Sequence, residues 1–208
     1  MNDNKKFWSK VAWIYEKFTR GGKSADKAYC EMEQSICNCL KADMKVLELA
    51  AGPGIMAPKI ARYCESLEIT DFSPAMLEQA KKRKISGNVK FAVADATNLA
   101  YEERSFDAVV IANALHIMPE PAKALKEIKR VLKKDGILIA PTFTRENIKS
   151  KLIEHIMEAV GFKTYSRWTH HSYVRFMKGK GFTVVEEKII KGHNFPISFL
   201  VCKTNKFS

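Results

Sequence analysis

Acidic side chains and glycines recur directly after apolar runs in the first half of the chain. Residues 46–54 (VLELAAGPG) place a glutamate, Glu48, within an apolar run that leads into two glycines. Gly52 and Gly54 permit positive φ angles, and they let a ligand approach the main chain where a Cβ would otherwise stand. A helix beginning here would point free N–H groups and its positive dipole end at that ligand. The stretch therefore favours a carboxylate-bearing ligand, although a plain tight turn would use the same glycines.

Two further acids follow the next two apolar runs. Asp71 follows the second run, and a carboxylate there can accept both hydroxyls of a ribose. The alternative is that Asp71 only begins the turn before the next helix, for which Ser73 is the expected N-cap. Asp95 follows the third run. Its side chain can accept from an exocyclic amine while the Ala96 N–H donates to a ring nitrogen, which is a pair of contacts that suits adenine.

Asn113 and His116 follow the fourth apolar run, 106–112 (FDAVVIA), at the position that would face the reacting end of a ligand. The glycine turn is not a P-loop, because no Gly-Lys-Ser/Thr follows it. It is also an incomplete dinucleotide fingerprint, because Ala50 takes the first glycine position and Ala57 takes the position three after Gly54. With three acids expected at one edge of a sheet, a ligand with a cationic centre fits better than a diphosphate.

The elements that must position these residues alternate between apolar strands and amphipathic helices. This alternation predicts crossover units and a parallel sheet covered on both faces. In such a sheet, ligands bind outside the carboxyl ends of the strands, which is where the acids lie. The last two strands are close together and predict a hairpin with an antiparallel edge. Strands are expected at 46–49, 67–70, 89–94, 106–112, 136–142, 182–190 and 195–202, and helices at 5–19, 24–40, 53–63, 74–84 and 120–132.

The bulk composition is that of a globular protein. Of the 208 residues, 46% are hydrophobic and 28% charged. No apolar run approaches the roughly 20 residues of a membrane span, and the N-terminus lacks a signal-peptide core, so we expect a cytoplasmic protein. The five cysteines are odd in number and scattered, which predicts neither a disulfide framework nor a metal site. The formal net charge of +12 fits either lysines on solvent-facing helix surfaces or a functional basic surface.

Four stretches in this order resemble the class I S-adenosylmethionine-dependent methyltransferases: VLELAAGPG, ITDFSPAML, VADATNLAYEERSFDAVVIANALHIM and EIKRVLKKDGILIAPTF. The resemblance is closest to the small-molecule branch that includes ubiquinone/menaquinone-biosynthesis methyltransferases. It covers residues 44–143 strongly and the C-terminal hairpin loosely. It implies a Rossmann-like, doubly wound α/β fold with a mostly parallel seven-stranded sheet in the order 3-2-1-4-5-7-6, strand 7 being antiparallel. It also implies that S-adenosyl-L-methionine is the cofactor and S-adenosyl-L-homocysteine the product.

The resemblance assigns one group of residues to the methionine end of the cofactor. The loop of Ala50, Gly52 and Gly54 would face the methionine moiety. Glu48 would lie near its ammonium group, which would account for an acid at the tip of a buried strand. Asn113 would contact the same end through its backbone. Many relatives carry glycine where this chain has Ala50, so the detailed shape of the loop is expected to differ.

A second group of residues is assigned by the same resemblance to the adenosine. Asp71 would hold the two ribose hydroxyls. Phe72 and Met76 would pack against the adenine. Asp95 would accept from the adenine amine, and Ala96 would donate its N–H to a ring nitrogen.

His116 is the candidate general base, since some methyl acceptors need deprotonation and histidine is the usual group for it. Packing within its loop is the alternative. Residues 1–42 are expected to form a helical lid, with Tyr15 reaching the cofactor. Residues 43–208 would form the methyltransferase domain, with a substrate-pocket insertion at about 145–180. The aromatic residues of that insertion suit an apolar or aromatic acceptor that is quinone-, phenol-, amine- or lipid-like.

Three other functions compete with this interpretation. An RNA methyltransferase would use the basic surface, but Asn113–His116 lacks the Asn/Asp-Pro-Pro-aromatic signature of amine methylation. A non-catalytic module could bind S-adenosylmethionine as a signal. A nicotinamide-dependent oxidoreductase would need a more glycine-rich phosphate loop. The expected partner is thus a small molecule rather than nucleic acid; peripheral contact with an anionic membrane is compatible, and the protein is expected to be a monomer or homodimer.

Overall fold

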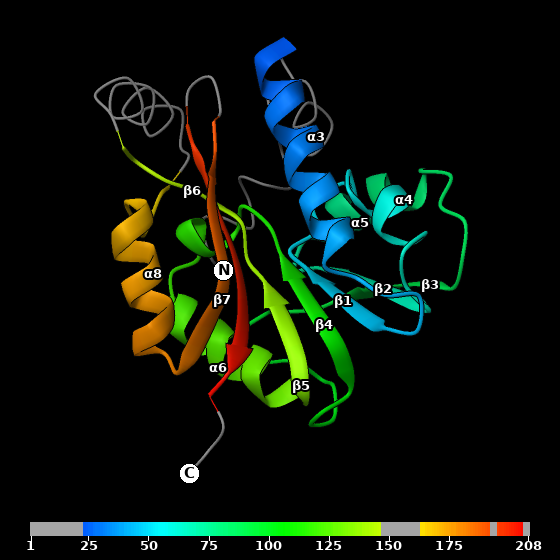
Figure 1. The fold of residues 1–208 in the computed structure, drawn as a ribbon. Helices are drawn as coiled ribbons and strands as arrows, with labels where there is room; N and C mark the ends of the chain where they lie inside the picture. The colour runs from blue at the N-terminus through cyan, green and yellow to red at the C-terminus, as the bar shows by residue number, and fades with distance from the viewer. Residues whose placement is uncertain (1–22, 147–162, 192–194, 206–208) are drawn as a thin grey trace.

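A single mixed sheet runs through the molecule (Figure 1). The computed structural model describes residues 23–146, 163–191 and 195–205. Within them the strand order is β3-β2-β1-β4-β5-β8-β6, and β7 pairs with β8. The strands are β1 (Lys45–Leu49), β2 (Ser66–Asp71), β3 (Val89–Val93), β4 (Phe106–Ile111), β5 (Leu132–Ile139), β6 (Thr142–Phe143), β7 (Phe182–Ile190) and β8 (Ile197–Thr204).

The predicted order 3-2-1-4-5-7-6 is confirmed, with β8 as the predicted strand 7 and β7 as the predicted strand 6. The first five strands pair in parallel, and β8 is antiparallel to both β5 and β7. The two-residue β6 is an addition, paired with β8 through Thr142 and Ser198. Pro141 separates β6 from β5, because proline has no N–H to donate to a ladder. The strand expected at 136–142 is therefore divided in two.

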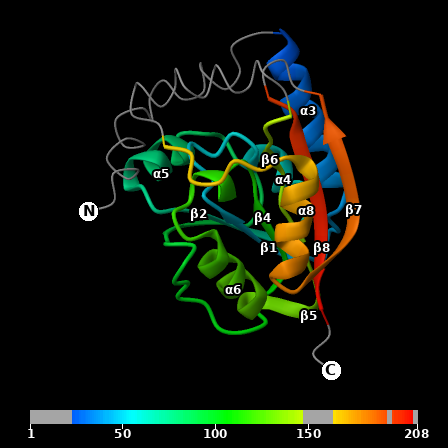
Figure 2. The same ribbon diagram turned by 90° about the vertical axis from the view of Figure 1, so that its left-hand side faces the viewer.

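Helices cover both faces of the sheet. They are α3 (Lys23–Asn38), α4 (Ala57–Ile60), α5 (Pro74–Lys81), α6 (Pro121–Val131) and α8 (His170–Gly179), with a short 3₁₀ helix, η1 (Leu115–Ile117). One hydrophobic cluster joins α3, α4 and α5 to one face, and a second joins α6 and α8 to the other. Figure 2 shows α3 and α8 beside the C-terminal hairpin, and the two clusters place them on its opposite faces. Among the described residues, no helix is long and apolar enough to cross a bilayer.

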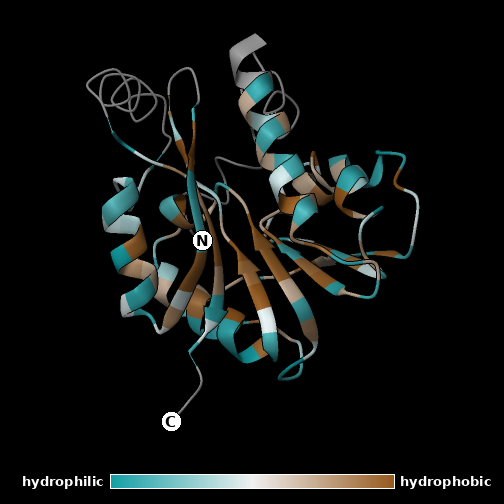
Figure 3. Ribbon diagram, in the orientation of Figure 1, coloured by the Kyte–Doolittle hydropathy of each residue, from teal (hydrophilic) through white to brown (hydrophobic). Residues whose placement is uncertain are grey.

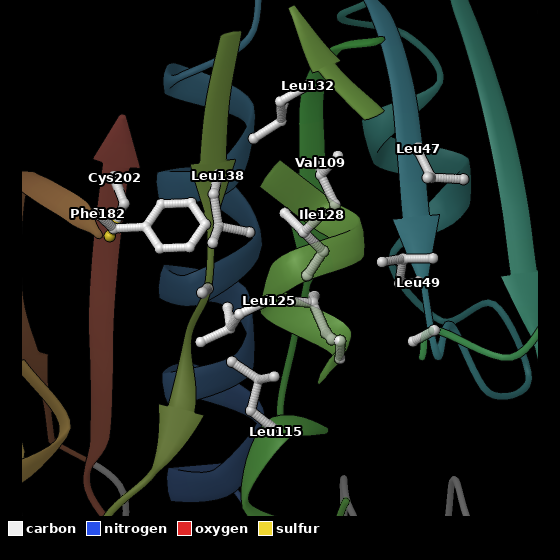
Figure 4. Packing of buried hydrophobic residues seen from close by; sticks show 14 of the residues in the cluster. Leu47, Leu49, Val109, Leu115, Leu125, Ile128, Leu132, Leu138, Phe182 and Cys202 are labelled. Atoms are coloured by element: carbon white, nitrogen blue, oxygen red, sulfur yellow. The ribbon is translucent and has the colours of Figure 1, made fainter. Parts of the chain in front are cut away.

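Side-chain alternation along the strands supplies the two halves of the core. Leu47 and Leu49 of β1 point to the α6 side, whereas Val46 points to the α3 side. Figure 4 shows the first half, in which Leu125 and Ile128 of α6 face the central strands. The central strands are apolar along most of their length, while the helices alternate hydrophilic and hydrophobic residues (Figure 3). A parallel sheet buried on both faces requires this pattern.

Two helical segments differ from the sequence-based expectation. The helix expected at 53–63 is only the four-residue α4, with Pro58 in its first turn. Proline is tolerated there but not farther inside a helix, so no helix could run through Pro58 from residue 53. Helix α8, which was not predicted, begins at Thr169 with a capping box completed by Ser172 rather than by the usual Glu or Gln. The helix expected at 5–19 lies outside the described residues.

Candidate functional site

Two adjoining recesses lie at the carboxyl ends of the parallel strands. The first recess, with about 650 Å³ of space including its open mouth, contains six of the predicted residues at its wall. The second recess, with about 800 Å³, contains Asp95 and Ala96. They share Ala50, Phe72, Ala114 and Ile117, so they form one continuous cleft. The predicted residues at the wall of the first recess are Ala50, Gly52, Asp71, Phe72, Met76 and Asn113.

The loop after β1 is held in a left-handed conformation at three alternate residues. The φ angles are +52° at Ala50, +58° at Gly52 and +65° at Gly54. A Cβ on Gly52 would meet no atom within 4 Å, whereas a Cβ on Gly54 would lie 2.9 Å from the Cβ of Ala80 in α5. Gly52 therefore keeps the recess open, and Gly54 lets α5 pack closely. Only the first of these two glycines faces the cleft.

Asp71 joins the ends of β2 and β1. Its Oδ2 accepts from the Gly52 N–H at 2.9 Å, and its Oδ1 accepts from the Ser73 N–H at 2.8 Å. Burial raises the pKa of Asp71 to about 6, although the backbone N–H groups of Ser73, Gly52 and Phe72 oppose the shift. Each carboxylate oxygen can accept a second hydrogen bond, so the carboxylate retains capacity for ligand hydroxyls. Ser73 occupies the predicted N-cap position but makes no side-chain capping bond.

The second recess lies beyond the end of β3. Asp95 is exposed there, and its Oδ1 accepts from both the backbone N–H and the hydroxyl of Thr97, at 2.9 and 2.8 Å. Oδ2 remains available to a ligand. Ala96 is buried at the recess wall, next to Asp95. This pairing of a carboxylate with an adjacent backbone group retains the geometry on which the adenine prediction was based.

Three buried acceptor oxygens near the first recess have no hydrogen-bond partner among the residues that the structure describes. They are both carboxyl oxygens of Glu48 and the side-chain carbonyl of Asn113. Asn113 has a φ of +51°, its backbone N–H donates to the Pro141 carbonyl at 2.8 Å, and its amide nitrogen contacts the Met32 sulfur at 3.7 Å. Because that N–H already donates to Pro141, the only backbone group of Asn113 that can contact a ligand is its backbone carbonyl. Unpaired buried acceptors are costly, and they call for a ligand that donates.

Glu48 is fully buried within β1, two residues before Ala50, and it lines neither recess. Burial raises its pKa to about 8, and the nearby carboxylates of Glu33 and Asp71 add to the shift. Thr70 fixes the strand beside it, donating its hydroxyl to the Glu48 backbone carbonyl at 2.9 Å. Glu48 is thus a fully buried acid close to two other carboxylates, behind the cleft wall that Ala50 forms.

His116 also lines neither recess. Its Nδ1 lies 3.0 Å from the Thr142 hydroxyl, and its ring packs edge-on against Phe143 with centroids 5.9 Å apart. Burial lowers the pKa of His116 to about 4. The imidazole therefore lies behind η1, against β6, while its neighbour Ile117 faces the cleft. A catalytic role for His116 stays a prediction, and the packing alternative matches its position.

Helix α3, which belongs to the expected lid of residues 1–42, supplies a wall of the cleft through residues that the sequence analysis did not name. Tyr29 and Met32 line the first recess, and Met32 and Ile36 are fully buried in the core. The available signal was the helical spacing of Tyr29, Met32 and Ile36, although nothing in the sequence says which strand ends such a helix covers. Tyr15 lies outside the described residues. The other lining residues that were not predicted are Ala51, Ile55, Met56, Ala112, Ala114, Ile117, Ala94, Thr97, Met118, Pro119 and Glu120.

Comparison with known proteins agrees with this geometry. Residues 47–140, which include the ends of β1 to β4, match a family described as "Methyltransferase domain". This region matches a methyltransferase domain. The match begins in β1 and ends just after β5, so it contains every cleft residue except those of α3.

The relatives of the methyltransferase domain include enzymes named for quinone biosynthesis. Demethylmenaquinone methyltransferase of Paenarthrobacter aurescens is 36% identical over 124 residues, which are 58% of this chain and 48% of the relative. The ubiquinone/menaquinone biosynthesis C-methyltransferase UbiE of Rhizobium etli is 32% identical over 170 residues, which are 78% of this chain and 58% of the relative. The chain therefore spans about half the length of the curated relatives it matches.

Solved structures resemble the methyltransferase domain in fold. A chain of the complex between the Haloferax volcanii Trm112 methyltransferase activator and the putative methyltransferase superposes with a TM-score of 0.78 at 19% identity, covering 99% of this chain and 98% of that one. The [4+2]-cyclase SpnF superposes with a TM-score of 0.77 at 15% identity, covering 97% and 96%. A chain named as a cyclase shares this fold, so the reaction must be argued from the cleft.

Proposed function

We propose that this protein transfers a methyl group from S-adenosylmethionine to a small, apolar or aromatic acceptor. The observation that carries the proposal is the composition of the continuous cleft. Polar groups lie where three strands end, at Asp71, Asp95 and Asn113, while α3 contributes the aromatic ring of Tyr29 and the apolar side chain of Met32. One part of the cleft suits a nucleoside with an amino-acid tail, and the rest suits an apolar acceptor.

The residues of the cleft fit the cofactor. The three unpaired acceptor oxygens of Glu48 and Asn113 need N–H donors, and an ammonium group has three. We assign Asp71 to the ribose hydroxyls, because both its oxygens are already oriented by backbone N–H groups and can accept further. Asp95 and Ala96 would bind the adenine edge, and Phe72, at the wall of both recesses, would pack against the ring.

When bound, the cofactor supplies an activated methyl on a sulfonium, so the chain's task is to hold the acceptor in line and to exclude water. Met32 and Ile117 line the recess with apolar side chains that would desolvate the acceptor. The names of the relatives favour a quinone-like acceptor. The expected lid of residues 1–42 and the insertion at 145–180 would complete the enclosure. The part of that lid within the structure, α3, already packs in the core.

An acceptor screen tests the proposal. The purified protein is incubated with S-adenosylmethionine and with reduced quinones, phenols, amines, lipids and RNA, and S-adenosylhomocysteine is quantified by chromatography with mass detection of the acceptor. The expected result is replacement of one hydrogen by methyl on an apolar or aromatic small molecule. Methylation of RNA alone would overturn the proposed acceptor class. Tight cofactor binding without turnover of any acceptor would favour the non-catalytic module.

A further inference from the structure

Glu48 carries an ionisable group in a fully buried position. Its side chain is 0% exposed, and neither carboxyl oxygen has a hydrogen-bond partner. An ionised carboxylate in such a place would lose its hydration without compensation, which is far more costly than burying the neutral acid. The side chain is therefore either protonated or stable as a carboxylate only when a cation binds beside it.

The charged groups that act on Glu48 are carboxylates. Glu33, 7% exposed, approaches from α3, and Asp71, 4% exposed, approaches from the end of β2. Cys64, which follows α4, is itself affected by the Glu48 charge, and its thiol stays neutral because burial raises its pKa to about 11. Asn113, which follows β4 and lines the first recess, has an uncharged side-chain carbonyl that is also unpaired among the described residues. These neighbours oppose ionisation of Glu48, in agreement with its pKa of about 8.

We propose that Glu48 is protonated in the ligand-free protein and gives up its proton when the ammonium group of S-adenosylmethionine binds, so that cofactor binding releases a proton. The inference rests on the proposed function and adds a linkage to it. The O–H bond of the acid breaks, its proton passes to the solvent buffer, and the resulting carboxylate accepts N–H bonds from the ammonium. The Asn113 carbonyl accepts another. The entering ammonium would thus supply the donors that Glu48 and Asn113 lack among the described residues.

Isothermal titration calorimetry at pH 7 in buffers of different ionisation enthalpy measures the number of protons released. A group with a pKa of about 8 is roughly nine-tenths protonated at pH 7, so the expected release on binding S-adenosylmethionine is close to one proton. S-adenosylhomocysteine carries the same ammonium and should release the same number. 5′-Methylthioadenosine has the adenosyl group without the amino-acid tail, and it should bind with a heat that does not depend on the buffer.

Two variants locate the proton. Glu48→Gln keeps the shape of the side chain and removes the ionisable group, so S-adenosylmethionine should bind it without proton release. Glu33→Gln, the matched control on α3, leaves Glu48 in place and should retain most of the release. If Glu48→Gln does not fold, the comparison of the two nucleosides on the unaltered protein still decides the question.

The outcomes test the proton linkage and the proposed function separately. Binding of S-adenosylmethionine with buffer-independent heat overturns the proton linkage and leaves the proposed function intact. Proton release that persists in Glu48→Gln assigns the proton elsewhere and also overturns the inference. No binding of S-adenosylmethionine overturns the proposed function and the linkage together.

Discussion

Asp71 at the end of β2 accepts a hydrogen bond at 2.9 Å from the backbone N–H of Gly52 in the loop after β1. Its other oxygen accepts from the Ser73 N–H at 2.8 Å. One carboxylate thus fixes the loop of one strand and the helix start of the next, on the wall of the first recess. An acid that was predicted for ligand binding also has a structural role.

Replacement of Asp71 tests both roles together. In Asp71→Ala, the predicted contacts to ribose and the support of the loop are lost, so the affinity for S-adenosylmethionine should fall at least tenfold, about 1.4 kcal/mol. The two buried N–H groups left without an acceptor should also lower the free energy of unfolding by about 1–3 kcal/mol. Calorimetry and denaturant unfolding measure the two effects. Asp135→Asn, an exposed site on β5, is the control and should change neither. An unchanged affinity in Asp71→Ala would count against the ribose assignment.

Ala50 lies in a backbone conformation that L-residues with a Cβ rarely adopt. At φ +52° its Cβ crowds the following carbonyl, which costs about 1–2 kcal/mol. Ala50→Gly should remove this strain, and after the greater flexibility of the unfolded chain is subtracted, stability should rise by about 0.5–1 kcal/mol. Ala51→Gly is the matched control, because Ala51 has no positive φ and should only lose stability. Thermal unfolding of both variants gives the comparison, and a loss of stability in both would show that position 50 is not strained.

His116 should make the protein less stable in acid. The unfolded imidazole takes up a proton as the pH falls below about 6.5, whereas the folded one resists until about pH 4, so stability is lost across this window as the pH falls. Between pH 7 and pH 5 the loss from this group is about 2 kcal/mol. The raised pKa values of Glu48 and Asp71 act in the opposite direction, so wild-type stability alone does not isolate the effect.

Comparison with a variant isolates the contribution of His116 to the pH dependence of stability. His116→Asn removes the titration and can keep a hydrogen bond to Thr142, so its unfolding free energy should fall by about 2 kcal/mol less than that of the wild type between pH 7 and pH 5. Denaturant unfolding at the two pH values measures this difference. His171→Asn, at an exposed position on α8, should behave as the wild type does. Equal pH dependence in His116→Asn and wild type would mean that the buried imidazole titrates like a solvated one.

The sequence predicted the strands of the cleft better than the residues that face it. β4 could be predicted because FDAVVI is apolar nearly throughout, and the loop glycines because only glycine adopts positive φ without strain. The direction of His116 could not be predicted. Successive residues of a 3₁₀ helix are about 120° apart, so the short η1 turns Ile117 toward the cleft and His116 away from it.

The position of Tyr29 and Met32 of α3 at the cleft wall could not be predicted, for a different reason. The spacing of Tyr29 and Met32 predicts a buried helix face, but the sheet edge that this face covers is decided by packing between distant parts of the chain. The α6-side core illustrates the same limit, because the cluster that contains Leu125 joins residues of β1, β4 and β5 (Figure 4). The local sequence pattern predicts a helix or strand and its apolar face. The element against which that face packs is determined by tertiary contacts.

Gly52 and Gly54 should respond differently to the same substitution. Both have positive φ, so alanine at either position costs about 1 kcal/mol or more in backbone strain. In Gly54→Ala the new Cβ would also stand 2.9 Å from the Ala80 Cβ, and overpacking of this kind adds about 1–3 kcal/mol. In Gly52→Ala the Cβ meets no protein atom within 4 Å but enters the recess wall. Gly54→Ala should therefore lose more unfolding free energy than Gly52→Ala. Gly52→Ala should nevertheless lose more affinity for S-adenosylmethionine than Gly54→Ala.

A double-mutant cycle separates the clash at Gly54 from the shared backbone strain. Ala80→Gly removes the atom that the new Cβ would meet, so the loss of unfolding free energy in Gly54→Ala should shrink by about 1 kcal/mol or more when Ala80→Gly is present. Gly52→Ala should show no such coupling to Ala80→Gly, because its Cβ does not approach α5. Denaturant unfolding of the five variants, beside calorimetry of the two alanine variants, completes the test. Additive losses at Gly54 and Ala80 would mean that α5 withdraws to admit the Cβ, and that the close packing of α5 on the loop is not what requires glycine at position 54.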